Sequence, residues 1–331
     1  MKFLQALLGR KAAAPSAASF VETAPNEIVL EGAPPFPIAK SIVREHGFPL
    51  VDWDAVNAWL AQVDTARRNE AWKACERGWL MHLEAALGAN YRLAESPIAV
   101  VLSSLEDKLA HVTVDYIERT LARITRVLDG LARAPEMGKE ILVVFDDEDT
   151  YYRYASIYVP DGEQATSGGM YLGSGCGHFV MTKADLHRIE PVIAHELTHS
   201  CLEHLDLPTW LNEGLAENTK GRLTRSARPQ FTPQQMHEKH LAFWNEARIQ
   251  EFWKGDAFYE PDAQNLAYDL ARIIVEQLAT DWDTLKAFAL AAKEEDAGAA
   301  AARQHLGVDL GEYVCALLEK SPSPRWSPSA H

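Results

Sequence analysis

The feature that most constrains this chain is a pair of histidines four residues apart, in the segment His195-Glu196-Leu197-Thr198-His199. Apolar residues recur at helical spacing before and within this segment, so we expect it to be helical. Four residues advance a helix by a little over one turn, which places both imidazoles on the same face. Two histidines placed in this way can bind one metal ion through their ring nitrogens.

A third metal-binding side chain is expected on the following helix. The segment WLNEGLAE offers Glu213 and, one helical turn later, Glu217. Two histidines and one glutamate give three protein ligands, the number that catalytic zinc sites keep so that one position stays open. Glu196 lies on the flank of the histidine face, from which it can act as a general base without binding the metal.

The segments HELTH and WLNEGLAE together resemble the gluzincin clan of zinc metallopeptidases, and compact bacterial peptidase-MA-like domains most closely. The resemblance implies that His195, His199 and Glu213 hold Zn²⁺, and that Glu196 takes a proton from a zinc-activated water during peptide hydrolysis. The chain departs from the thermolysin-like and alanyl-aminopeptidase-like families in one respect. Only 13 residues separate His199 from Glu213, which is shorter than the spacing in either family.

The same resemblance implies supporting roles for residues near the ligands. Glu217 stands four positions after Glu213, where the clan places an acidic residue that bonds a zinc histidine and fixes its tautomer. Asn212 completes the Asn-Glu pair and is expected beside the ligands. Tyr268, on a helix expected over residues 263–278, is the candidate partner of the developing oxyanion. The alternatives for that last role are Tyr171, His178 and His187.

A glycine-rich segment before the histidines predicts a β-hairpin, since residues 167–177 contain five glycines in eleven positions. Gly168 and Gly169 open its first strand, where glycine often marks a close backbone approach. In the clan an edge strand at this place pairs with the substrate backbone. We therefore expect Gly168, Gly169, Met170 and Tyr171 to bind substrate, with an ordinary hairpin strand as the competing interpretation.

Other metal sites and other functions stay open at this point. A metzincin-type site would need glycine and histidine where the chain has Leu202 and Leu205, so it is disfavoured. Asp206 is an alternative third ligand, and a Cys176 thiolate is an alternative cap for the zinc. The functional alternatives are a non-catalytic zinc-binding scaffold, a helical interaction protein with an accidental motif, and a hydrolase of non-peptide amides or esters.

The order of elements along the chain predicts an α+β fold of the zincin-like type. We expect a small mixed sheet with an antiparallel edge strand, an active-site helix and a mainly helical C-terminal subdomain. Strands are expected near Ile98–Leu102 and Ile141–Phe145, and helices near 105–134, 186–205 and 208–225. The expected divisions are a disordered lead-in (1–40), a helical N-terminal module (41–94), the metallopeptidase domain (95–320) and a disordered tail (321–331).

Composition narrows the class of partner. The net charge of −15 disfavours binding to nucleic acid, because an acidic surface repels phosphates. No run approaches the roughly 18 apolar residues of a transmembrane segment. The four cysteines show no CxxC pair and are expected to be free thiols. We therefore expect a cytoplasmic protein that acts on a peptide or protein substrate, with cleavage preference and oligomeric state left open.

Overall fold

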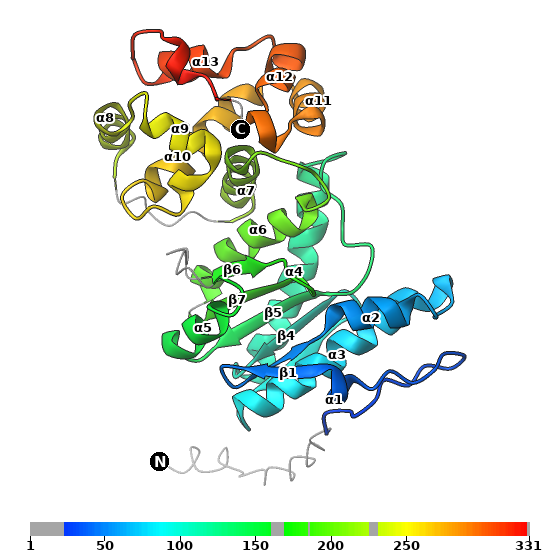
Figure 1. The fold of residues 1–331 in the computed structure, drawn as a ribbon. Coiled ribbons are helices and arrows are strands. Elements are labelled where there is room, and N and C mark those ends of the chain that lie inside the picture. The colour runs from blue at the N-terminus through cyan, green and yellow to red at the C-terminus, as the bar shows by residue number, and fades with distance from the viewer. Residues whose placement is uncertain (1–22, 160–168, 185, 225–230, 330–331) are drawn as a thin grey trace, which may run out of the picture.

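The computed structural model describes residues 23–159, 169–184, 186–224 and 231–329 (Figure 1). Its centre is a five-stranded mixed sheet with the strand order β3-β4-β5-β7-β6. The three inner strands run parallel, whereas β3 and β6 form the two edges and are antiparallel to their neighbours. The strands are β3 (Arg92–Glu95), β4 (Ala99–Ser103), β5 (Glu140–Phe145), β6 (Gly169–Leu172) and β7 (His178–Thr182).

Helices cover both faces of this sheet, because successive side chains of a strand point to opposite sides. In β5, Leu142 and Val144 join the core that contains α4 and α6, while Ile141 and Val143 join the core that contains α2, α3 and α5. The sheet is therefore the middle of three layers (Figure 1). These helices are α2 (Trp53–Leu60), α3 (Arg68–Leu87), α4 (Asp107–Val127), α5 (Glu148–Ala155) and α6 (Leu186–Leu202).

A second body made of helices follows α6 and lies at the red and yellow end of the chain (Figure 1). Its first helix, α7, packs against both α6 and α10 and so joins the two bodies. The close contact needs a glycine, since a Cβ atom on Gly214 would lie 2.6 Å from the Ala271 carbonyl oxygen. The helices are α7 (Thr209–Leu223), α8 (Pro233–Phe243), α9 (Arg248–Lys254), α10 (Gln264–Leu278), α11 (Trp282–Ala291), α12 (Ala299–Ala301) and α13 (Leu310–Leu317).

The N-terminal part differs from expectation in two ways. Residues 1–22 lie outside the described residues, but Ile28, Phe36 and Ile38 are buried in the core beside α3, so residues 23–40 are not a disordered lead-in. Residues 41–94 are not wholly helical either. The short helix α1 (Ile38–Ser41) ends at the first of them, and α2 and α3 lie within this range. The range also contains the antiparallel pair β1 (Ile42–Glu45) and β2 (Phe48–Val51), and the edge strand β3.

The C-terminal segment is also packed against the body of the protein. Trp326 is 3% exposed, and its carbonyl oxygen accepts a hydrogen bond of 2.8 Å from the Trp253 indole. The expectation of a disordered tail is therefore wrong for residues 321–329. The last two residues lie outside the described part of the chain.

The coarse prediction of the fold is confirmed. The protein is α+β, with a small mixed sheet and an antiparallel edge strand, β6, that directly precedes β7 and α6. The two helices expected around the metal-binding motif are present as α6 and α7. Among the described helices, none combines the length and the apolar character that crossing a bilayer requires.

Candidate metal centre

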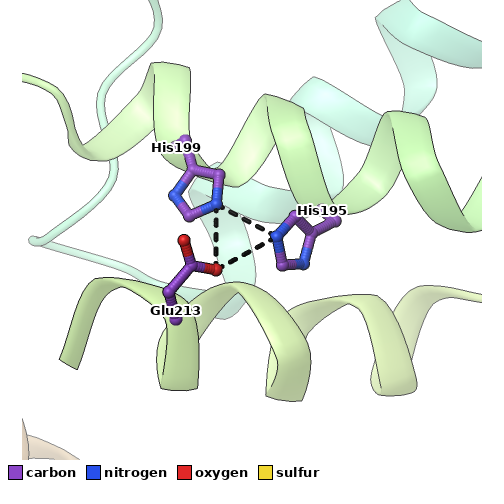
Figure 2. A group of neighbouring side chains, drawn as sticks. All are labelled: His195, His199 and Glu213. Atoms are coloured by element: carbon purple, nitrogen blue, oxygen red, sulfur yellow. Dashed lines mark hydrogen bonds and ion pairs between the residues drawn. The ribbon is translucent and has the colours of Figure 1, made fainter. Parts of the chain in front are cut away.

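Three side chains from two adjacent helices converge on one point (Figure 2). His195 and His199 project from α6, and Glu213 projects towards them from α7. The two Nε2 atoms are 3.1 Å apart, and Glu213 Oε2 lies 3.2 Å from His195 Nε2 and 3.4 Å from His199 Nε2. Three potential ligand atoms thus form a nearly equilateral triangle, as the sequence predicts.

The contacts of the second ring nitrogen, Nδ1, indicate where the hydrogen of each imidazole lies. His199 Nδ1 is 3.0 Å from Asn212 Oδ1, and His195 Nδ1 is 3.2 Å from Glu217 Oε1. An amide oxygen only accepts hydrogen bonds, so His199 Nδ1 carries the hydrogen, and the charged contact with Glu217 favours the same position in His195. In the neutral rings, both Nε2 atoms consequently direct lone pairs towards the Glu213 carboxylate. The predicted supporting roles of Asn212 and Glu217 agree with this geometry.

This triangle fits a bound metal ion. Ligands that are about 2.0–2.1 Å from a tetrahedral zinc ion are about 3.3 Å from one another, and the observed edges are 3.1 to 3.4 Å. Glu213 Oε2 is buried and has no hydrogen-bond partner in the described structure, although both Nε2 atoms are close to it. A buried polar atom of this kind is expected to have a partner, and a cation would supply one.

The charges of the group also favour a cation. Burial lowers the pKa of His195, but its contacts with Glu213 and Glu217 outweigh burial and raise that pKa to about 10, so without a metal the ring holds a second proton that a bound metal ion would replace. Burial raises the pKa of Glu213, and the two histidines lower it by more, so its pKa lies below the usual range and the carboxylate is charged. Within the described residues, this is the group of His, Cys, Asp and Glu side chains whose ligand atoms lie close enough to share an ion.

Glu196 lies beside the metal group and does not belong to it. Its side chain borders the same cavity, and the residue is 6% exposed. Burial raises the pKa of Glu196, and the neighbouring His195 and His199 offset only part of that effect. A buried carboxyl with a raised pKa next to a metal group is suited to accepting and returning a proton.

A cavity of about 810 Å³ opens onto the metal group. One wall is the edge strand β6, which contributes Gly169, Met170 and Tyr171, while Gly168 lies outside the described residues. Gly169 allows β6 to approach α6, because a Cβ atom there would lie 2.7 Å from Val192 Cγ1. The predicted substrate strand therefore borders the site, and its glycine does mark a close approach.

Tyr268 of α10 also lines the cavity. Its ring centroid is 6.1 Å from that of His195. Burial, reinforced by the charges of Glu213 and Glu196, raises the pKa of the Tyr268 phenol, so the phenol keeps its proton. It is therefore available as a hydrogen-bond donor in the cavity.

Two alternatives for the metal site are wrong. Asp206 is exposed and forms an ion pair of 3.6 Å with Lys293, so it does not replace Glu213 as a ligand. Cys176 is buried with its Sγ atom 3.8 Å from Glu76 Oε1, and burial raises the pKa of its thiol. It is therefore a protonated thiol held at the hairpin by a glutamate of α3, and not a cap for the metal.

Two of the three alternative oxyanion partners are engaged elsewhere. His178 accepts a hydrogen bond of 2.9 Å from the Tyr154 phenol and lies 2.7 Å from the Cys176 carbonyl oxygen, and burial lowers its pKa to about 4. The Tyr171 phenol donates to Glu203 over 3.1 Å. The side chain of His187 lies outside the described part of the structure.

Sequence reasoning missed one charged side chain at the site. Lys220 lines the cavity and forms an ion pair with the same Glu217 oxygen that faces His195. The signal was present in the sequence, since Lys220 lies three residues after Glu217 on the same face of a predicted helix. Gly214 was also missed, because its role depends on a contact with α10 that no local pattern encodes.

A search among known protein families finds no match to this chain, and a search among curated proteins finds none either. The arrangement of the chain's own side chains is therefore what indicates its function. That arrangement combines a metal-binding triangle, a buried carboxyl and a cavity whose volume is within the range of ligand pockets, about 300–1,000 Å³.

Proposed function

We propose that this protein is a zinc metallopeptidase of the gluzincin type. In this proposal His195, His199 and Glu213 bind the metal, and Glu196 is the general base. The observation that carries it is the triangle of ligand atoms, in which two Nε2 atoms and a buried carboxylate oxygen lie 3.1 to 3.4 Å apart, with the Glu196 carboxyl bordering the same cavity.

Zinc is the metal that this donor set favours. Two imidazole nitrogens and one carboxylate oxygen match the three-ligand catalytic zinc sites, whereas magnesium and calcium prefer oxygen ligands alone. When bound, Zn²⁺ supplies a Lewis acid that polarises a substrate carbonyl and acidifies water. Glu217 and Asn212 hold the two imidazoles in the tautomer that such binding requires.

The chain's own residues account for the proton movements of amide hydrolysis. Glu196 accepts a proton from the attacking water and later passes it to the leaving amine, a role that its raised pKa supports. The protonated Tyr268 phenol donates a hydrogen bond to the oxygen of the tetrahedral intermediate. Both side chains border the cavity that contains the metal group.

The position of β6 supports a peptide as the substrate. It is an edge strand of the sheet and borders the cavity on the side of Glu196. An extended peptide can add to such an edge by backbone hydrogen bonding, which brings a peptide bond to the base and the metal group. Small non-peptide amides would make no use of this strand.

The variant Glu196→Gln tests the proposal. We expect it to keep its metal and to lose turnover by a factor of about 10² to 10⁴, because the amide cannot accept the proton. Cleavage of a peptide library is followed by mass spectrometry, and metal content is measured on the same preparations. Glu190→Gln, on the same helix but outside the cavity lining, is the matched control and is expected to retain activity.

Two outcomes would contradict the proposal in different ways. Full activity in Glu196→Gln would show that another group is the base. A wild-type protein that binds one metal ion but cleaves no peptide in a broad library would favour the non-catalytic zinc-binding scaffold.

A further inference from the structure

The ring of Tyr171 lies in a slot formed by two glycines of the hairpin. A Cβ atom on Gly177 would collide with the Tyr171 phenol oxygen and lie 2.9 Å from Cζ, and one on Gly173 would lie 3.4 Å from Cε1. The ring also packs against Phe179 of β7, with 5.0 Å between centroids. Two of the five glycines in this segment are thus explained by a side chain that needs their missing Cβ atoms.

The outer end of the ring is fixed to the helix that carries the histidines. The Tyr171 phenol donates a hydrogen bond of 3.1 Å to Glu203 Oε2, and Glu203 directly follows the last residue of α6. Burial, reinforced by Glu203, raises the pKa of the phenol, so it stays protonated and keeps donating. Tyr171 therefore links the edge strand to the end of the active-site helix.

The backbone of the same residue borders the catalytic groups. Tyr171 and Met170 line the cavity, and the Tyr171 backbone forms a hydrogen bond with Glu196. At the start of β6, Gly169 rests against Val192 of α6. The close approach at Gly169 and the Tyr171–Glu203 link thus both act on the position of β6 relative to α6.

We propose that Tyr171 is a positioning residue that, through its hydrogen bond to Glu203, holds β6 at the separation from α6 that an extended peptide needs. The inference rests on the proposed function, in which β6 binds the substrate backbone. The metal ligands and Glu196 lie on α6 and α7, which pack on each other without the Tyr171 side chain. Loss of the link consequently weakens substrate binding more than it slows the chemical step.

A series of glycine-to-alanine variants tests the role. In Gly177→Ala the new methyl group displaces the ring and breaks the link, and we expect KM to rise about tenfold, the factor for losing one hydrogen bond to a charged group. The value of kcat and the metal content are expected to stay near wild type. Gly173→Ala is expected to have a smaller effect. Gly221→Ala is the control, since a Cβ atom there meets nothing within 4 Å.

Removing the two partners of the bond provides an independent check. Tyr171→Phe and Glu203→Ala are each expected to raise KM, and their combination is expected to raise it no further, because both remove the same link. Hydrogen exchange of the β6 amides, measured without substrate, is expected to accelerate in Tyr171→Phe and Gly177→Ala but not in Gly221→Ala.

The outcomes separate this inference from the proposed function. Wild-type exchange at β6 in Tyr171→Phe would overturn the positioning role, whether or not the protein is a peptidase. Equal falls in kcat and kcat/KM for Gly177→Ala would also overturn it, because the defect would then lie in the chemical step. Absence of peptide cleavage by the wild type would refute the proposed function, while the exchange experiment would still decide whether the link holds the strand.

Discussion

At the scale of single residues, the positions of two imidazole hydrogens determine which ring nitrogens can bind a metal ion. The Nδ1 atoms of His195 and His199 face Glu217 and Asn212. The two Nε2 atoms face the Glu213 carboxylate (Figure 2). The carboxylate behind His195 makes that ring more basic, while the amide behind His199 is neutral. Lys220 shares the carboxylate oxygen with His195 and moderates its charge.

The role of Tyr268 can be tested at this scale. In Tyr268→Phe the oxyanion loses a donor, and we expect kcat to fall by a factor of about 10² with the metal content unchanged. Steady-state kinetics and metal analysis measure both quantities. Tyr313→Phe, whose phenol bonds Gln277 in the C-terminal body, is expected to leave kcat unchanged. A wild-type kcat in Tyr268→Phe would show that its ring only packs, as it does against Phe258.

At the scale of elements, the site depends on how closely α7 lies between α6 and α10. Glu213 reaches the histidines because α7 packs on α6, and Tyr268 reaches the cavity because α10 packs on α7. Gly214 stands at the second contact, where a Cβ atom would also lie 2.6 Å from Val275 Cγ2. Gly214, next to the third ligand, thus allows α7 and α10 to pack closely.

The variant Gly214→Ala tests this contact. A methyl group there forces α7 and α10 apart, and overpacking of this kind costs about 1–3 kcal/mol in the free energy of unfolding. Because Glu213 is the preceding residue, we also expect weaker metal binding. Gly221→Ala, on the same helix in open space, is expected to be neutral or to stabilise by up to about 1 kcal/mol through helix propensity. Urea unfolding and metal titration measure the two effects, and equal stabilities of the two variants would contradict the packing argument.

Local sequence patterns predicted the helices and strands that carry the ligands. They missed the features that depend on contacts between segments far apart in the sequence. The helix around His195 has an apolar stripe at helical spacing, and the hairpin has turn glycines, so both were predictable. The helix of Glu213 was predicted from the WLNEGLAE motif that follows. The strands β1, β2 and β3 have four residues each, too few for alternation to be recognised. The prolines in residues 23–40 indicate extended backbone, but they do not show whether this segment packs against the rest of the protein. The Tyr171–Glu203 link joins distant segments and had no local signal.

At the scale of the whole molecule, a buried polar contact joins the sheet to the active-site helix. Glu140, at the start of β5, is 4% exposed and accepts hydrogen bonds of 3.1 and 3.2 Å from the Ser200 hydroxyl of α6. Burial is the main cause that raises the pKa of Glu140 from 4.5 to about 7. Two hydrophobic cores meet at this sheet, so the contact affects the stability of the whole fold.

The raised pKa predicts how stability depends on pH. Folding favours the protonated carboxyl, so the contribution of Glu140 is fully present below pH 4.5 and is lost as pH rises through about 7. Between pH 5 and pH 8 we expect the wild type to lose about 2–3 kcal/mol of unfolding free energy relative to Glu140→Gln. Urea unfolding of both proteins at the two pH values measures this difference. Parallel pH dependence of the two proteins would show that Glu140 is ionised in the folded state.

The proposed function depends on His195, His199 and Glu213 binding one cation together. Metal analysis by mass spectrometry tests this binding. After equilibration with zinc and removal of free metal, the wild type and Glu196→Gln are each expected to retain about one zinc ion per chain, the stoichiometry of a three-ligand site. The variant Glu213→Ala is expected to lose it. A wild type that holds no zinc, or a Glu213→Ala variant that binds it as tightly as the wild type, would contradict the account.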